Sequence, residues 1–104
     1  VRVNAVAPGW IASSGLDNYP PDMREHIRNL KKLSPLGRIG TESEVSAAVV
    51  FLLSEAASFI TGATLRVDGG VPLTRPSRPM PKHATPAPAF DGFHLARQPD
   101  VLRD

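Results

Sequence analysis

The first nine residues of the chain form a strand pattern that ends abruptly in a proline-glycine pair. Val1, Val3 and Val6 favour an extended backbone, because branched side chains pack well on a pleated surface. Pro8 removes a backbone donor and fixes φ, and Gly9 lets the chain pass where a Cβ would collide. The sequence therefore predicts a strand that leads into a tight turn. Ligands bind beyond the carboxyl ends of strands in open parallel sheets, so this turn is a candidate binding site.

Two helices are expected after the turn. Residues 20–33 begin with two prolines, which suit a helix start, and carry apolar side chains at helical spacing. These side chains are Met23, Ile27 and Leu30. Further on, Thr41 and Glu44 have the spacing of a capping box, and a nearly continuous apolar run follows them. The second helix should therefore be covered on more than one side.

A short strand pattern over residues 63–67 closes with an Asp-Gly-Gly turn at 68–70. Together with the first strand and the second helix, it predicts a parallel strand-helix-strand unit. The rest of the chain differs, since seven of the eleven prolines follow residue 71. We therefore divide the chain into residues 1–71, which are patterned for a core, and an extended proline-rich tail over residues 72–104.

An ordered series of motifs supports a family resemblance. Arg-Val-Asn-x-Val-x-Pro-Gly at 2–9, Phe-Ile-Thr-Gly at 59–62 and Val-Asp-Gly-Gly at 67–70 occur in this order with fitting spacings. The chain thus resembles the C-terminal third of a short-chain dehydrogenase/reductase, most closely the 2-enoyl-CoA reductase, 3-oxoacyl reductase and citronellol-type (terpenoid-alcohol) dehydrogenase branches. The series is more specific than a single glycine motif.

The resemblance implies the α/β fold class: a C-terminal fragment of a Rossmann-type doubly wound parallel sheet, with its last two strands, the intervening helices and an irregular tail. It implies an NAD(P)-dependent oxidoreductase that moves a hydride between nicotinamide and a carbonyl, alcohol or enoyl carbon of an acyl or isoprenoid substrate. The family's Tyr-x-x-x-Lys catalytic pair is missing, since Met23 lies four residues after the only tyrosine, Tyr19. No catalytic residue is assigned, and the fragment alone is expected to be inactive.

The resemblance also implies the binding residues. Four residues of the turn are expected to hold the cofactor, NAD or NADP: Pro8, Gly9, Ile11 and Ser13. A backbone peptide suits an amide ligand because it offers one donor and one acceptor in a rigid arrangement. Trp10 and Tyr19 are expected to line the substrate cavity, although Trp10 fits a core or subunit-interface position equally well. The segment 20–33 is expected to cover the substrate, or else to be an ordinary surface helix.

Composition excludes several functions. The absence of cysteine excludes disulfides, thiolate catalysis and cysteine-based zinc sites. His26, His83 and His94 lack metal-ligand spacing, so no metal site is expected. The net charge of +2 is small and scattered, which argues against a nucleic-acid partner. No apolar run approaches the length of about 20 residues that a membrane span needs. The cytoplasm is the expected location.

Two alternatives belong to other functional classes. The chain is also compatible with a non-catalytic oligomerisation module, and the intact protein is expected to be a homo-oligomer, a dimer or a tetramer. In addition, Gly37 and Gly40 form the Gly-x-x-Gly pattern with which KH modules clamp a nucleic-acid backbone. That pattern is a weak signal, because acidic residues follow it at once and too few strands flank it.

Overall fold

A computed structural model describes residues 1–75, 77–78, 80, 82, 84–90, 92 and 99–102. Its strands and α-helices are β1 (Ala5–Pro8), β2 (Ile11–Ala12), α1 (Arg24–Asn29), β3 (Gly40–Thr41), α2 (Glu42–Leu53) and β4 (Thr64–Val67). Short 3₁₀ turns lie between them at Ser14–Asn18, Pro21–Met23, Leu30–Leu33 and Glu55–Ala57, and two more follow β4 at Val71–Leu73 and Asp100–Leu102.

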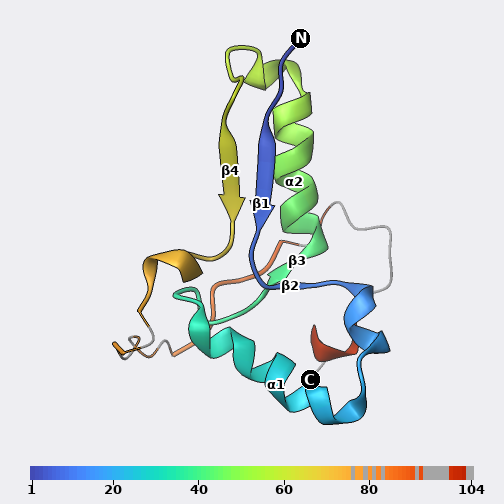
Figure 1. The fold of residues 1–104 in the computed structure, drawn as a ribbon, viewed down its shortest axis with the longest axis vertical. Helices are drawn as coiled ribbons and strands as arrows, with labels where there is room; N and C mark the ends of the chain where they lie inside the picture. The colour runs from blue at the N-terminus through green and yellow to red at the C-terminus, as the bar shows by residue number, and fades with distance from the viewer. Residues whose placement is uncertain are drawn as a thin grey trace.

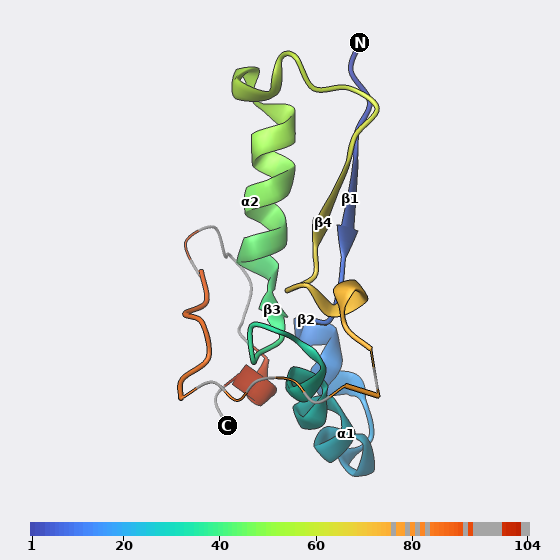
Figure 2. The same cartoon turned by 90° about the vertical axis from the view of Figure 1, so that its left-hand side faces the viewer.

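The central layer is a parallel pair of strands with one helix on it. β1 pairs with β4 in a register that runs from Ala5 opposite Thr64 to Pro8 opposite Val67. Figure 2 shows α2 on one face of this pair, and α1 lies beyond the carboxyl ends of both strands in Figure 1. The expected parallel strand-helix-strand unit is therefore confirmed.

The start of α2 has the predicted capping box. The Thr41 hydroxyl accepts a hydrogen bond from the Glu44 N–H (3.3 Å), and the Glu44 carboxylate accepts one from the Thr41 N–H (2.9 Å). Ala48 and Leu52 of the same helix are buried. Val45 and Ala47 are half-buried, and four further apolar side chains are exposed, namely Val49, Val50, Phe51 and Leu53. The chain itself thus covers α2 on one side.

The end of α2 is held by a side chain from the first residues of the chain. The Arg2 guanidinium donates to the carbonyls of Leu52 and Ile60, each at 3.1 Å, and to that of Ser54 at 3.4 Å. A cation is favourable at this end because the last carbonyls of a helix are unpaired and carry partial negative charge. Arg2 therefore joins the start of the chain to the far end of α2.

A second parallel ladder, which the sequence did not predict, lies next to the first. β2 pairs with β3 in the register Ile11 opposite Gly40 and Ala12 opposite Thr41. Each strand has two residues, too few for an alternating pattern to be recognised. β3 thus lies in the stretch between the two expected helices. This ladder joins the turn after β1 directly to the start of α2.

The helix predicted over residues 20–33 is shorter than expected. Only Arg24–Asn29 is α-helical, with a 3₁₀ turn on each side. Ile27 is buried, whereas Met23 is partly exposed, so the apolar face is anchored at one point. The helical stretch ends before Ser34 for a local reason as well. Ser34 precedes Pro35 and adopts the extended backbone that this position favours (φ −92°, ψ 128°).

Two described parts of the tail lie against the first 71 residues. The carbonyls of Ala87, Pro88 and Phe90 accept hydrogen bonds from side chains of residues 38–41. Further along, the Asp100 N–H donates to the Asp17 carboxylate at 3.1 Å, next to the buried Pro99. The described tail therefore returns to the region around the turn after β1.

Candidate functional site

The turn after β1 packs tightly against the end of β4. The Gly9 N–H donates to the Val67 carbonyl at 2.9 Å, which continues the ladder by one residue. A Cβ at Gly9 would lie 2.7 Å from the Asp68 Cβ and 2.8 Å from its Cα. The sequence correctly indicated that a side chain here would collide. The atoms that it would meet belong to Asp68, in the turn after β4.

The peptide groups of Ile11 are directed away from the neighbouring strand. In a parallel ladder, one residue of each pair bonds to the residues on either side of its partner. Gly40 takes this role, since its N–H donates to the Trp10 carbonyl at 2.8 Å. The N–H and C=O of Ile11 consequently face away from β3. The carbonyl accepts from the Ser13 N–H at 3.1 Å and retains a second lone pair.

The side chain of Ile11 uses the room left by the glycine at position 40. A Cβ at Gly40 would lie 2.7 Å from the Ile11 Cδ1, so the glycine leaves the room that this side chain occupies. Gly40 is also bonded to the Trp10 carbonyl. The backbone at Ile11 is thus held from the β3 side, by the ladder and by the room that Gly40 leaves, which gives the preorganisation that a binding backbone needs.

Ser13 follows directly, at the start of the 3₁₀ turn Ser14–Asn18. Its backbone carbonyl accepts from the Leu16 N–H at 3.0 Å, but its side chain makes no capping hydrogen bond with this turn. Ser13 is half-buried, whereas the adjacent Ser14 is exposed. The two serines therefore form a natural comparison, with the same side chain in two different surroundings.

Trp10 and Tyr19 lie around a common cavity of about 200 Å³. Ile11 and Ile27 also line this cavity, so it lies between the turn after β1 and helix α1. Its lining is largely apolar, with the tyrosine hydroxyl and the imidazole of His26 as polar groups. Of the residues expected to bind ligands, Trp10, Ile11 and Tyr19 are brought together here. Pro8, Gly9 and Ser13 are near in sequence but line neither of the cavities at Trp10.

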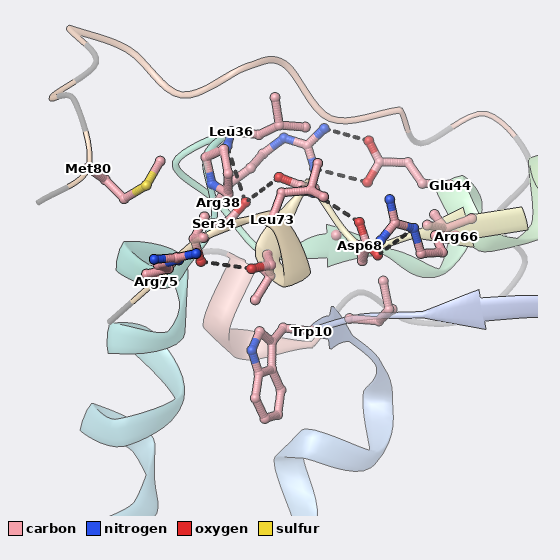
Figure 3. A pocket seen from close by; sticks show the side chains of 18 of the residues that line it. Trp10, Ser34, Leu36, Arg38, Glu44, Arg66, Asp68, Leu73, Arg75 and Met80 are labelled. Carbon is pink, nitrogen blue, oxygen red and sulfur yellow. Dashed lines mark hydrogen bonds and ion pairs between the residues drawn. The ribbon is translucent and has the colours of Figure 1, made fainter. Parts of the chain in front are cut away.

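A larger cavity of about 870 Å³ lies on the β4 side of the same turn. Trp10 and Ile11 line it as well, together with the Asp68, Gly69 and Gly70 turn. Figure 3 shows Trp10 on one side of this cavity and Arg38 facing Glu44 on the other. The Asp-Gly-Gly turn was correctly predicted: the Asp68 carboxylate accepts from the Gly70 N–H at 2.9 Å, and both glycines have positive φ.

An ion pair closes one wall of the larger cavity. The Arg38 guanidinium donates to both carboxylate oxygens of Glu44, at 2.6 and 2.9 Å. Burial by itself raises the pKa of Glu44, but hydrogen bonds from Arg38 and from the N–H groups of Thr41 and Phe90 outweigh it. The net pKa therefore lies below the ordinary value, and Glu44 is ionised at neutral pH.

The sequence missed the wider role of this pair. Glu44 was identified only as a capping residue, and Arg38 only as part of a Gly-x-x-Gly loop. In the structure Arg38 also donates to the carbonyls of Ala87 (2.5 Å), Pro88 (3.1 Å) and Ile39 (3.2 Å). An arginine six residues before a glutamate carries no distinctive signal, because the contact depends on how loop and tail return to the helix start.

Metal ligands and membrane segments were searched for in the described residues. That part of the chain holds no group of three or more histidine, cysteine or acidic side chains able to bind a metal ion. His83 and His94 lie outside the described residues. In the same ranges, no helix has both the length and the apolar character to cross a bilayer.

Comparison with known proteins identifies the class. Residues 1–72 match the family described as enoyl-(acyl carrier protein) reductase. Glucose 1-dehydrogenase 2 of Bacillus subtilis is 49% identical over 74 residues, which cover 70% of this chain and 28% of that protein. 2-(S)-Hydroxypropyl-CoM dehydrogenase 3 of Xanthobacter autotrophicus is 44% identical over 77 residues, 68% of this chain and 29% of that protein.

Solved structures agree. A putative oxidoreductase from Escherichia coli K-12 has a TM-score of 0.55 and 41% identity, and the match covers 78% of this chain and 28% of that one. YwfH, an NADPH-dependent reductase involved in bacilysin biosynthesis, has a TM-score of 0.59 at 32% identity, covering 68% and 30%. The chain belongs to the short-chain dehydrogenase/reductase family. It spans less than a third of the length of these relatives.

Proposed function

We propose that this chain forms the nicotinamide-amide half and the substrate cover of an NAD(P)-dependent oxidoreductase. The observation that carries the proposal is the β2–β3 register, which directs the peptide groups of Ile11 away from the ladder. A carboxamide needs one acceptor for its N–H and one donor for its C=O, and the backbone N–H and C=O of one residue, Ile11, provide both. Membership of the family supports NAD or NADP as the ligand.

The turn residues have distinct tasks in this proposal. Pro8 and Gly9 end β1 and bring the chain close to Asp68, so that the peptide at Ile11 is presented beyond the carboxyl ends of the strands. The Ser13 hydroxyl, which is not used for capping, serves as a further hydrogen-bonding group at the same end of the cofactor. When bound, a reduced nicotinamide would give a hydride to the substrate carbon, and an oxidised one would take a hydride from it.

The smaller cavity is the proposed substrate side of the site. Trp10 and Tyr19 provide large apolar surfaces with one polar group each, and α1 forms the opposite wall. Such a lining suits the apolar part of an acyl or isoprenoid substrate with a carbonyl, alcohol or enoyl group. The proton relay is assigned to residues outside these 104, because the sequence holds no Tyr-x-x-x-Lys pair. The chain alone is therefore expected to bind without turnover.

The experiment joins this chain to the preceding part of its Bacillus subtilis relative, glucose 1-dehydrogenase 2. Oxidation of the reduced cofactor with carbonyl and enoyl substrates is followed by the loss of nicotinamide absorbance. Ser13→Ala should raise the KM for the cofactor by about two- to tenfold, the range of one lost neutral hydrogen bond. Ser14→Ala removes the same hydroxyl at the exposed neighbour and should leave this KM unchanged. Equal effects of both variants would contradict the proposed role of Ser13.

We also propose that the intact protein is a homo-oligomer. Four apolar side chains of α2 are exposed, and Leu53 retains 78% of its accessible surface. Exposed apolar surface of this kind is unfavourable in water and is typical of interfaces. Sedimentation of the joined protein tests the proposal: Leu53→Lys should reduce the oligomer fraction, whereas Leu33→Lys, on an exposed leucine away from α2, should not. A monomer at all concentrations would contradict it.

The nucleic-acid alternative has less support. Its Gly-x-x-Gly loop depends on backbone and basic groups that can reach a phosphate. Arg38, the cation of this loop, already donates five hydrogen bonds to Glu44 and to chain carbonyls. Gly40 is paired in β3 with its N–H on Trp10. We therefore favour the oxidoreductase.

A further inference from the structure

The 870 Å³ cavity is partly built from residues that follow the family match. The match ends at residue 72. Five residues of the lining come after it, namely Leu73, Thr74, Arg75, Arg78 and Met80. One wall of this cavity is therefore contributed by the chain's own tail. Figure 3 shows Met80 and Arg75 on the opposite side of the cavity from the Arg66 and Asp68 pair.

The tail is anchored on the loop that forms the opposing wall. Arg38 binds the carbonyls of Ala87 and Pro88. The Thr41 hydroxyl donates to the Phe90 carbonyl at 2.7 Å, and the Phe90 N–H donates to Glu44 at 3.2 Å. These contacts fix the later part of the tail against the loop and the start of α2. They also occupy the guanidinium of Arg38, which is thus unavailable to a ligand.

The remaining charges around the cavity are unbalanced. Arg38 is neutralised by Glu44, and the Arg66 Nε lies 3.8 Å from the Asp68 Oδ2. Within the described ranges, the structure gives neither Arg75 nor Arg78 a carboxylate partner, although both line the cavity. Two arginines therefore line the same space. Guanidinium forks match the oxygen geometry of carboxylate and phosphate groups.

The rest of the lining is largely apolar. Trp10, Leu36, Leu73 and Met80 contribute side chains to it. Met80 is suited to contacts with ligands of differing shape, because its side chain is flexible and polarisable. A volume of about 870 Å³ lies within the range of about 300–1,000 Å³ that is usual for small-molecule sites. The cavity thus joins an apolar surface to a basic rim.

We propose that this cavity is a second binding site, which takes an amphiphilic anion: an apolar chain that ends in a carboxylate or a phosphate. The apolar part lies against Trp10, Leu36 and Met80, and the anionic end is held by Arg75 and Arg78. The proposal goes beyond the nicotinamide site, since it depends on side chains after residue 72. The test of this second site and the test of the nicotinamide site are independent, so that either proposal can fail while the other holds.

The test uses the single tryptophan as the reporter, because Trp10 lines the cavity. The 104-residue chain is titrated with decanoate, decyl phosphate and decanol below their aggregation concentrations, and tryptophan emission is recorded. Both anions should saturate the change in emission, and decanol should bind at least about tenfold more weakly, since it lacks the charge-assisted hydrogen bonds. The tighter of the two anions identifies the head group. Decanol binding as tightly as decanoate would overturn the proposal.

Charge variants assign the effect to the two arginines. Arg75→Gln combined with Arg78→Gln should weaken both anions by about tenfold or more and leave decanol unchanged. The matched control, Lys31→Gln with Lys32→Gln, removes the same two charges from exposed positions outside the cavity and should change nothing. Replacement of both arginines by lysine should restore part of the binding, which separates charge from folding. Equal loss in the control, or displacement of decanoate by NADH in a one-to-one ratio, would overturn the proposal.

Discussion

The close packing of Gly9 against Asp68 offers a sharp test. In Gly9→Ala, the new Cβ would lie 2.7 and 2.8 Å from the Cβ and Cα of Asp68, and neither atom is the flexible end of a side chain. The carboxyl ends of β1 and β4 must therefore separate. Gly9 has no positive φ, so the cost arises from packing alone. Overpacking of this kind costs about 1–3 kcal/mol, and we expect the free energy of unfolding to fall by that amount.

The control is Gly15→Ala. Its new Cβ would meet only the Ser13 Oγ, at an ordinary 3.4 Å, and Gly15 also lacks a positive φ. Loss of chain entropy in the unfolded state should make this variant equal to the parent or more stable by about 0.4–1 kcal/mol. Urea unfolding followed by circular dichroism compares the two variants. If Gly9→Ala unfolded at the same urea concentration as Gly15→Ala, the inferred contact between the turn and β4 would be refuted.

Three further variants test the contacts around α2. Arg2→Met should lower the free energy of unfolding by about 1.5–3 kcal/mol, because it leaves the carbonyls at the end of α2 without their charged donor. The control Lys32→Met removes a positive charge at an exposed position and should have little effect on the urea midpoint. Thr41→Ala should lower the free energy of unfolding by about 1–2 kcal/mol in the same assay, and Thr41→Ser should lower it much less, since serine keeps the capping hydroxyl. Equal losses in the two variants would argue against the cap. Ionised Glu44 contributes its full share of the stability above its ordinary pKa of 4.5, and this contribution is lost as the pH falls through its lowered pKa. Because the Phe90 N–H donates to Glu44, the Phe90 amide resonance should titrate with acid in the parent chain and not in Glu44→Gln.

Local signals in the sequence predicted the elements that they determine. The capping pair of Thr41 and Glu44 fixes where α2 begins, and the Asp-Gly-Gly sequence fixes the turn after β4. The parallel pairing of β1 with β4 also followed from the order of strand, helix and strand. For the cap and the turn, the residues that decide the conformation are adjacent or lie within one helical turn of each other. The ordered series of family motifs also predicted the class of protein.

Contacts between distant segments were beyond such signals. The β2–β3 ladder joins residues about thirty positions apart through two residues on each side, and its main chain bonds are independent of side-chain pattern. The same holds for Arg38, whose partners in the tail lie some fifty residues away. The expected helix over residues 20–33 was too long because propensity alone does not stabilise a helix with one buried anchor, Ile27.

The central claim is that the peptide at Ile11 holds the carboxamide of the nicotinamide. An isotope-labelled sample of the joined protein, titrated with NADH and with ADP-ribose, tests it most directly by NMR. The account predicts that the Ile11 amide resonance shifts with NADH and not with ADP-ribose, which lacks the nicotinamide, and that a nuclear Overhauser contact joins this amide to the nicotinamide ring. Saturating NADH that leaves the Ile11 amide unmoved would contradict it.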